Sequence, residues 1–541
     1  MSDILQEAIA LHDAGRLREA EALYREILHI TPRQPAHAIV WYNLGTLLAS
    51  QERPAEAETA LRAAIDIQPD LVEAHNNLGI LLQKQERLAE AESSSRQALR
   101  LRPDMRDALV NLGAILRKQK RHQEAETVYR EILRHDPGHV DAIANLGVLL
   151  HAMQRHPEAE TAYREALRRN PRHVDALFNL GIQLWEEKRF TEAEAAYRAV
   201  LRLQPDHANA RWNLSFLCLT LGNFREGWPL FEARTDPQLQ EQNSPLIQAP
   251  FPVWRGEAVV GKSFLIVTEQ GFGDQIQFCR FADTLKTMGA SRITLVAPQP
   301  LAALLATLRG VDAVRIPEPQ TSFAWHDFWI HPLSIPWRLG ITPETIPATL
   351  PYLSAPPERV AAWRDRLPDT QDTRVGLVWK GSPGHRNDAN RSLPGLATLA
   401  PLWQVARTTF VSLQKGADEE EARHPPPGQP LSHLGEALTD FADTAAAITL
   451  LDLVITIDSS VAHLAGALGK RCWVLLPWHG TDWRWMPDRE ESPWYPGVMR
   501  LFRQGRDEDW SAVVIRVAAE LSRWSIRDPA APPMPAHGHM T

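Results

Sequence analysis

The chain is 541 residues long, with 44% hydrophobic and 23% charged residues and a formal net charge of −8. Its length allows three or four domains, and its composition is typical of globular proteins that bury large cores. The negative charge argues against a protein that binds nucleic-acid duplexes, because such a protein needs a positive surface against the phosphates.

Cysteine usage and the N-terminal residues indicate where the protein works. The three cysteines, Cys218, Cys279 and Cys472, are widely separated, so they predict neither a disulfide framework nor a thiolate zinc site. Such cysteines fit a reducing cytoplasm. The first residues lack the basic start and apolar run of a signal peptide, and no stretch of 18 apolar residues could span a membrane. We therefore expect a cytoplasmic protein without a membrane span.

The first 235 residues repeat a pattern with a period of 34. The triplet Asn-Leu-Gly recurs at that spacing, beginning at Asn43, Asn77, Asn111, Asn145 and Asn179, and a variant triplet begins at Asn213. An alanine stands 12 residues after each of the five glycines, and a proline stands 24 residues after each of these glycines. Each unit predicts two amphipathic helices closed by a proline. One pair cannot bury its apolar face alone, so the pairs should stack into an all-α solenoid.

This pattern closely resembles the tetratricopeptide family over about residues 1–235, with about seven repeats. The small residues should lie where the two helices cross closely, and large side chains such as Tyr129, Tyr163 and Tyr197 should fill the space between them. The last unit departs from the pattern, because Gly227 and Arg234 replace its small alanines. Such a departure is expected of a cap or junction repeat.

The six asparagines should form a ladder, because equivalent residues of stacked repeats return at the same height. Helices pack roughly 8–10 Å apart, which is about three residues of an extended chain. An amide both donates and accepts, so the ladder could hold a peptide backbone without reading its side chains. Protein-modifying O-GlcNAc transferases have such a ladder, and by that resemblance it would bind a protein acceptor. A generic protein-binding groove is the alternative.

The second half of the chain has a different pattern. Residues 236–256 are polar and contain prolines, which predicts a junction. From Gly261 onward, short apolar runs alternate with helical segments, and a second set of the same kind begins at Arg374. We expect two Rossmann-like α/β lobes, at about 257–352 and 353–541, that bind ligands in a cleft at the carboxyl ends of their strands.

A candidate catalytic residue follows the first of these strands. The segment Glu269–Asp274 contains two glycines, which permit a tight turn and a close approach by a substrate. Asp274 would then begin a helix and face the cleft, where its carboxylate could take a proton from an acceptor hydroxyl. Capping of that helix is the structural alternative.

A candidate donor site lies in the second lobe. The strand LVITI is followed by Asp458-Ser459-Ser460-Val461-Ala462-His463, which opens a helix. A helix N-terminus offers free N–H groups and a positive dipole end to a diphosphate, and the two serines add hydroxyl donors. An ordinary helix cap with a packed or solvated His463 is the alternative.

Three further residues could contact the donor. Asp443 begins an earlier helix and could accept hydrogen bonds from ribose hydroxyls, or it could cap that helix. Lys380 and Arg391 follow another strand and bring positive charge that could offset a leaving diphosphate, or they could be solvated. A tryptophan-rich segment near the C-terminus could stack on a ligand, but packing across the lobes is the favoured interpretation. Its tryptophans are Trp478, Trp483, Trp485 and Trp494.

Together these motifs resemble the GT-B glycosyltransferases that include the bacterial ADP-heptose transferases, over about Gly261 to Arg503. The resemblance implies that Asp274 is the base, that Asp443 binds the donor ribose, and that the donor diphosphate lies against Ser459, Ser460, Val461 and His463. Lys380 and Arg391 correspond more loosely. The resemblance also implies a nucleotide-sugar donor and no cofactor or bound metal. The segment Asp327–Leu333 departs from the family, because it is one residue longer and has Trp329 where a histidine is expected.

The leading hypothesis is a metal-independent transferase that moves a sugar to a Ser or Thr hydroxyl of a protein. The combination of repeats and transferase is similar to bacterial proteins that glycosylate flagellin, which makes flagellin a candidate acceptor. Two other interpretations stay open. One is a tetratricopeptide scaffold with a degenerate transferase domain, and the other is a transferase that acts on a glycan or a lipid.

Overall fold

A computed structural model describes residues 2–30, 37–240, 249–317, 323–416 and 418–525. The chain divides into two compact units, Met1–Pro205 and Asp206–Thr541. The predicted junction 236–256 and the predicted C-terminal tail lie partly outside the described residues.

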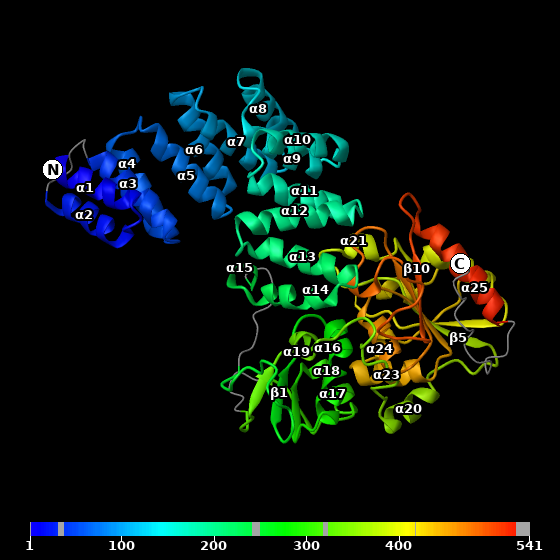
Figure 1. The fold of residues 1–541 in the computed structure, drawn as a ribbon. Coiled ribbons are helices and arrows are strands. Elements are labelled where there is room, and N and C mark those ends of the chain that lie inside the picture. Colours follow the sequence, from blue (N-terminus) through cyan, green and yellow to red (C-terminus); the bar gives the residue numbers. More distant parts are fainter. Residues whose placement is uncertain (1, 31–36, 241–248, 318–322, 417, 526–541) are drawn as a thin grey trace. The chain divides into compact units, whose positions relative to one another are not determined.

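The first unit is a series of antiparallel helix pairs, as the 34-residue period predicts (Figure 1). Within each pair a turn of a few residues precedes the second helix. The apolar residues of this helix recur every three or four positions, so they form one face, and charged residues form the other. The helices are α1 (Ser2–Asp13), α2 (Leu17–Ile30), α3 (His37–Ser50), α4 (Pro54–Ile67), α5 (Val72–Lys84), α6 (Leu88–Leu101), α7 (Arg106–Lys118), α8 (His122–His135), α9 (Val140–Ala152), α10 (His156–Arg169), α11 (Val174–Glu186) and α12 (Phe190–Leu203).

The repeated glycine allows the two helices of a pair to touch. A Cβ atom on Gly113 would come within 2.6 Å of the Tyr129 ring, and one on Gly147 within 2.7 Å of the Tyr163 ring. Both tyrosines are completely buried. Any larger residue in place of these glycines would therefore push the helices apart, which confirms the predicted packing of small residues against tyrosines.

A repeated arginine links neighbouring repeats. Arg87, just before α6, donates to Glu90 of α6 at 2.7 Å and to Glu58 of the preceding repeat at 2.7 Å. The same pair of bonds is made by Arg53, Arg121, Arg155 and Arg189. The 34-residue period of these arginines is visible in the sequence, but their partners become apparent only when the repeats are stacked.

The second unit begins with one more helix pair. It consists of α13 (Ala208–Thr220) and α14 (Phe224–Phe231), followed by η1 (Glu232–Thr235) and α15 (Pro237–Gln240). Trp228 on α14 lies 5.4 Å from Trp483 and 6.2 Å from Phe278, measured between ring centroids. Its indole nitrogen donates to the Ile341 carbonyl at 3.1 Å. The last helix pair thus shares a hydrophobic core with the α/β part, although its sequence continues the repeats.

The first sheet is parallel, with the strand order β3-β2-β1-β4. Its strands are β1 (Ser263–Val267), β2 (Arg292–Val296), β3 (Ala313–Arg315) and β4 (Phe328–Ile330). The accompanying helices are α16 (Phe272–Phe278), α17 (Phe281–Thr287), α18 (Gln299–Leu305), η2 (Pro332–Ser334) and α19 (Ile335–Leu339). All five residues of β1 are buried, which is typical of a parallel strand covered on both faces.

The second sheet is also parallel, with the order β10-β9-β8-β5-β6-β7. Counted from β5, this is the order 3-2-1-4-5-6 that is common among doubly wound sheets. Its strands are β5 (Thr373–Val378), β6 (Thr408–Ser412), β7 (Ser432–His433), β8 (Leu453–Ile457), β9 (Cys472–Leu476) and β10 (Met499–Arg503). The other elements are α20 (Pro357–Arg364), α21 (Asp388–Arg391), η3 (Leu396–Gln404), α22 (Glu419–Arg423), η4 (Gly435–Ala437), α23 (Phe441–Thr449), α24 (Ser460–Ala467), η5 (Trp483–Trp485) and α25 (Trp510–Ser525).

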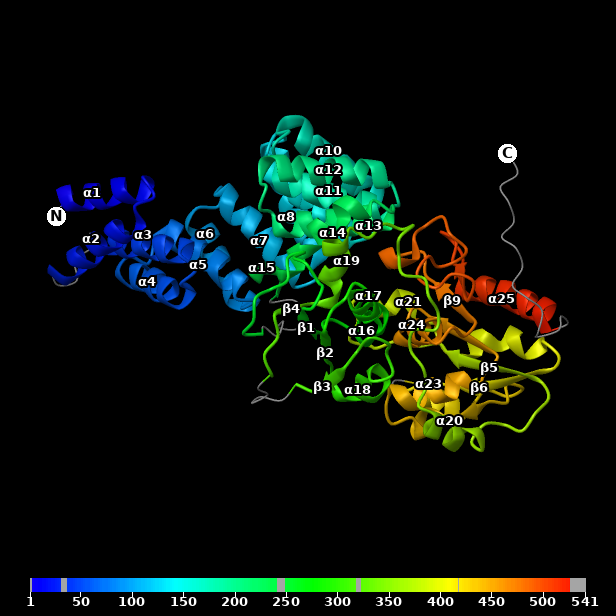
Figure 2. The ribbon, with the colours of Figure 1, turned by 60° about the horizontal axis from the view of Figure 1, so that its bottom comes forward.

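Helices cover both faces of the second sheet (Figure 2). On one face, Val375 and Leu377 of β5 pack in a core with residues of η3 and α25. On the other face, Val454 of β8 belongs to a larger core that includes α23 and α24. Alternate residues of each strand serve these two cores, as the two-residue period of a strand requires.

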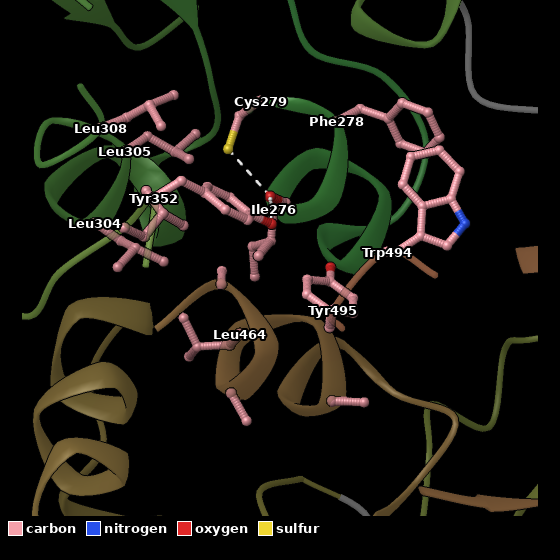
Figure 3. Close-up of a cluster of buried hydrophobic side chains, with 14 of the residues drawn as sticks. Ile276, Phe278, Cys279, Leu304, Leu305, Leu308, Tyr352, Leu464, Trp494 and Tyr495 are labelled. Atoms are coloured by element: carbon pink, nitrogen blue, oxygen red, sulfur yellow. Dashed lines mark hydrogen bonds between the residues drawn. The ribbon is translucent and has the colours of Figure 1, made fainter. Parts of the chain in front are cut away.

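The larger core joins the two sheets within the second unit. Figure 3 shows Ile276 of α16 above Leu464 of α24, with Tyr352 and Tyr495 alongside, and Phe278 next to Trp494. Arg280 is buried here, where it donates to the Trp494 carbonyl at 2.8 Å and to the Tyr352 hydroxyl at 3.1 Å. No helix in the described ranges is both long and apolar enough to cross a bilayer.

Candidate active site

The predicted site residues follow strands that are neighbours in the two sheets. Asp274 follows β1, which pairs with β4. Arg391 and Asp458 follow β5 and β8, which pair with each other where the strand order of the second sheet reverses. Ligands of doubly wound sheets bind outside the carboxyl ends of the strands at such a reversal. The topology therefore places these residues where a ligand is expected.

Asp274 lies in the first turn of α16. Its carboxylate caps this helix and also contacts η5, which belongs to the part of the chain around the second sheet. Its Oδ2 accepts from the Gly271 N–H at 3.0 Å, so the capping alternative is confirmed. Its Oδ1 accepts a hydrogen bond from Arg484 of η5. Burial raises the pKa of Asp274 above its ordinary value, the positive charge of Arg484 opposes this, and the negative charge of Asp482 adds to it. A carboxylate with a raised pKa is a better proton acceptor than a solvated one.

Arg484 is the charged residue that connects the two sheets at this point. Its Nη1 donates to Asp482 Oδ2 at 2.8 Å, while its Nη2 donates to Asp274. The side chain is only 7% exposed. Its guanidinium also lies 4.6 Å from the Trp483 ring centroid. The sequence marked this segment only as rich in tryptophan, so Arg484 was missed as a site residue.

Asp458 and Arg391 lie beside this group. Burial and the negative charge of Asp482 raise the pKa of Asp458 to about 6, against the nearby Arg391 and Arg484. Arg391 donates from Nη1 to the Asp458 carbonyl at 3.1 Å and from Nε to Asp388 at 3.2 Å. A Cβ on Gly381 would come within 2.6 Å of Arg391 Nη2, so this glycine makes room for the guanidinium. Arg391 is thus held against the end of β8, next to Ser459.

The predicted diphosphate turn opens α24 as expected. Ser459 is the N-cap residue of the helix, but its side chain does not cap it. Instead, its Oγ lies 2.9 Å from Thr456 Oγ1. Ser460 is half-buried and Val461 is buried. A Cβ on Gly273 would lie 3.5 Å from the Ser460 Cα, so the N-terminal turns of α16 and α24 are in contact. Two positive helix ends therefore meet next to Arg484.

His463 is a buried, packed residue of this turn, and its contact with a diphosphate stays a prediction. It is 6% exposed, its Nδ1 lies 3.0 Å from the Tyr495 hydroxyl, and its ring stacks on Trp485. A Cβ on Gly273 would come within 2.9 Å of its Cδ2. Burial lowers the pKa of His463 well below its ordinary value, and the charge of Arg484 adds to this effect. A neutral, packed imidazole supports the helix contact, in agreement with the packed alternative.

Asp443 makes internal hydrogen bonds through both of its carboxylate oxygens, and its ribose role stays a prediction. Its Oδ1 accepts from Arg359 at 2.6 Å and from the Trp363 indole at 3.0 Å, while its Oδ2 accepts from the Thr439 N–H at 3.0 Å and from the Thr439 hydroxyl. These hydrogen bonds, against the opposing effect of burial, lower the pKa of Asp443 to about 2. The helix is capped by Asp440, whose Oδ1 accepts from the Asp443 N–H. The carboxylate therefore joins α20 to α23.

Lys380 lies at the edge of the site. Its backbone N–H donates to Gln414 at 3.0 Å, and its Nζ lies 3.7 Å from Asp418. Its ammonium is therefore weakly paired, as expected for a residue that could approach an anion.

The tryptophans of the C-terminal segment are core residues. Trp483, Trp485 and Trp494 are buried, and Trp478 is half-buried. The favoured packing interpretation is therefore confirmed for the first three.

Strand β4 explains why the segment Asp327–Leu333 departs from the family pattern. Trp329 lies inside β4, pairs with Leu265 and packs in a small core with Val267 and Val296. His331 follows the strand, and its Nδ1 lies 2.8 Å from the Val267 carbonyl. Thus Trp329 stabilises the sheet, and His331 is the histidine at the carboxyl end of the strand.

The asparagines occupy equivalent half-buried positions on α3, α5, α7, α9 and α11, and Asn213 does so on α13 of the second unit. Asn111 donates to Asn76 of the preceding repeat at 2.8 Å. Asn145 and Asn179 instead donate to carbonyls one turn earlier in their own helices. The peptide-binding role of the ladder stays a prediction.

Comparisons with known proteins bear on the repeats. A tetratricopeptide-repeat family model matches residues 5–71, 76–140, 145–208 and 183–238. Protein FlbA of Caulobacter vibrioides is 28% identical in an alignment of 333 residues that covers 56% of this chain and 53% of FlbA, so the chain matches about half the length of this relative. A tetratricopeptide repeat protein of Parabacteroides merdae is 17% identical, with a TM-score of 0.40, over 44% of this chain and 96% of its own. YrrB, described as having an unusual peptide-binding site, is 22% identical, with a TM-score of 0.25, over 32% and 89%. The N-terminal part of the chain, through residue 238, consists of tetratricopeptide repeats.

Proposed function

We propose that the protein is a GT-B glycosyltransferase that moves a sugar from a nucleotide-sugar to a Ser or Thr hydroxyl of a protein. The observation that carries this proposal is the bond between Asp274 and Arg484, made beside the N-terminus of α24 at the carboxyl ends of two parallel sheets. A transferase of this class needs a base on one side of the sugar and positive groups around the departing diphosphate. Both kinds of group are present here.

In the proposed reaction Asp274 takes the proton of the acceptor hydroxyl. The acceptor oxygen forms a bond to the anomeric carbon while the bond from that carbon to the diphosphate breaks. The nucleoside diphosphate leaves with its negative charge against the first turn of α24, Ser459, Ser460 and Arg391. The raised pKa of Asp274 suits this role.

Arg484 would change partners when the donor binds. Its guanidinium is held by Asp274 and Asp482. A diphosphate is a bidentate anion that competes well for a guanidinium. Transfer of Arg484 from Asp274 to the diphosphate would free the carboxylate for the acceptor and stabilise the leaving group in the same step.

The repeats would recruit the acceptor. Tetratricopeptide arrays present extended surfaces that bind other proteins. The equivalent positions of the asparagine ladder support a protein acceptor over a glycan or a lipid, because amides can hold a peptide backbone at regular intervals.

One alternative function has structural support. Asp443 and His463 are committed to internal contacts, which fits a chain whose transferase part no longer binds a donor. In that case the protein would act as a scaffold through its repeats.

Thermal stabilisation by nucleotides distinguishes the two functions. We expect one nucleoside diphosphate, or CMP, to raise the melting temperature of the full chain, and Arg391→Gln to reduce that increase. Asp443→Asn is the matched control, because it should lower the melting temperature without removing the nucleotide-dependent increase. No increase with any nucleotide would favour the scaffold.

A further inference from the structure

Two histidines and a glutamate meet between two repeats of the first unit, apart from the candidate active site. His151 is near the end of α9, His156 begins α10, and Glu186 ends α11. One ligand atom from each lies within 4.8 Å of the other two. The three residues therefore converge from three helices.

The contacts of these side chains leave one buried nitrogen without a partner. His151 Nε2 lies 2.7 Å from Glu186 Oε2, and His156 Nε2 lies 3.1 Å from Gln154. His156 Nδ1 is buried and has no hydrogen-bond partner among the described residues. The two imidazole ring centroids are 5.3 Å apart. A buried polar atom without a partner is unfavourable, and a bound ion would satisfy it.

The cluster is specific to one place in the repeat array. One repeat earlier, the equivalent positions hold Arg117, His122 and Ala152, and one repeat later they hold Trp185, Phe190 and Thr220. The repeat geometry alone therefore does not create the cluster, because neither neighbouring position contains three metal-ligating side chains.

A buried polar residue supports the turn that contains His156. Gln183 is completely buried, at a position where the other repeats have Leu47, Leu81, Ile115, Leu149 and Leu217. Its Nε2 donates to the His156 carbonyl at 2.6 Å and to Glu187 at 3.0 Å. Replacement of a core leucine by glutamine has a cost in burial. It occurs only in the repeat that faces His156, where it fixes the backbone of a ligand residue.

We propose that His151, His156 and Glu186 form a binding site for a divalent transition metal ion, with Zn²⁺ as the representative ion. Two imidazoles and one carboxylate are a ligand set that zinc accepts, whereas magnesium prefers oxygen ligands alone. Tetrahedral zinc places its ligand atoms about 3.4 Å apart, so the side chains need to move by only about 1 Å. The fourth position is open to water or to a group from a bound protein.

Isothermal titration calorimetry of the full chain with ZnCl₂ tests the site. His537 and His539 should both be changed to Asn in all samples, because this His-Gly-His segment can chelate metal by itself. We expect one saturable Zn²⁺ site per chain and no comparable binding of Mg²⁺. His156→Ala and Glu186→Gln should each weaken Zn²⁺ binding at least tenfold.

The matched control is His122→Ala, which removes the equivalent histidine one repeat earlier and should leave Zn²⁺ binding unchanged. Zn²⁺ should also raise the melting temperature of the control variant but not that of His156→Ala. Equal Zn²⁺ binding by His122→Ala, His156→Ala and Glu186→Gln would overturn the proposal, as would no Zn²⁺ binding by the parent chain. Because nucleotide binding plays no part in this test, its outcome is independent of the proposed transferase function.

Discussion

Arg234 forms a buried ion pair with Glu269, with two nitrogen–oxygen distances of 3.0 Å. Arg234 lies in η1 at the end of the repeat region, and Glu269 follows β1 of the first sheet. The side chains are 2% and 1% exposed. Arg234 also donates to Ser334 and Glu232, each at 2.5 Å. Arg234, which departs from the repeat pattern, therefore links the last helix pair to the segment between β1 and α16, the helix that contains Asp274.

Removal of one partner of this pair should be strongly destabilising. We expect Arg234→Met to lower the free energy of unfolding of the second unit by about 3–5 kcal/mol, because Glu269 is left charged and buried. The double variant Arg234→Met/Glu269→Gln should be more stable than the single variant. Urea unfolding followed by tryptophan fluorescence measures both, and Arg309→Met, at an exposed ion pair, is the control. A single variant as stable as that control would contradict the role of the pair.

The boundary between the two units predicts where the chain can be cut. A fragment that begins at Asp206 should fold, because it keeps α14 against the sheets. A fragment that begins at Asp236 should aggregate or lose cooperative unfolding, because it removes Trp228 and Phe231 and exposes the face of Trp483 that they cover. Calorimetry of the two fragments gives the comparison. Equal cooperative transitions in both would show that the last helix pair is dispensable.

Asp443 should stabilise the protein at pH values above the ordinary pKa of an aspartate. Its pKa in the folded protein is about 2, below the unfolded value near 4, so its stabilising effect is present above pH 4 and is lost as pH falls toward 2. Asp443→Asn should therefore cost about 2 kcal/mol at pH 7 and much less near pH 2.5. Melting temperatures at the two pH values measure this difference. Equal melting temperatures of the two proteins at pH 7 would be inconsistent with an internal role.

Asp458 should have the opposite pH dependence. Its folded pKa is about 6, above the unfolded value near 4, so the folded protein takes up a proton between pH 6 and pH 4 and gains stability relative to neutral pH. Asp458→Asn should raise the free energy of unfolding at pH 8 by an amount on the order of 2 kcal/mol, and with it the melting temperature, and should change both little at pH 4. A lower melting temperature at pH 8 would indicate that the charged carboxylate is stabilising.

The elements found from the sequence are those that contain a complete local signal. The strands β1, β8 and β9 are nearly continuous apolar runs, and β2, β5 and β6 end in shorter buried runs, which are typical of buried parallel strands. In contrast, β3 and β7 have three and two residues, and β10 (Met499–Arg503) has arginines at both its second and last positions. Pairing with a neighbouring strand, which the local sequence does not record, makes these segments strands.

The sequence predicts candidate site residues that lie after strands, but it does not predict those that depend on distant partners. Asp274 lies in the segment after β1 and Ser459 in the turn after β8, so chain order alone predicts their location. Arg484 is 210 residues from Asp274, and its role depends on the contact between the two sheets. The internal partners of Asp443, Arg359 and Trp363, lie about 80 residues earlier in the chain, so the local sequence does not reveal them.

Sugar transfer by the Asp274→Asn variant tests the central claim most directly. The full chain should be incubated with labelled nucleotide-sugars of the nucleotide class that stabilises it, and with flagellin or total cell protein as the acceptor. Asp283→Asn, on α17, is the matched control. We predict that the unaltered chain and the control incorporate sugar into protein, and that Asp274→Asn binds the nucleotide normally but transfers sugar about 10²–10⁴-fold more slowly. Undiminished transfer by Asp274→Asn, or no transfer by a chain that binds the nucleotide, would contradict the proposed mechanism.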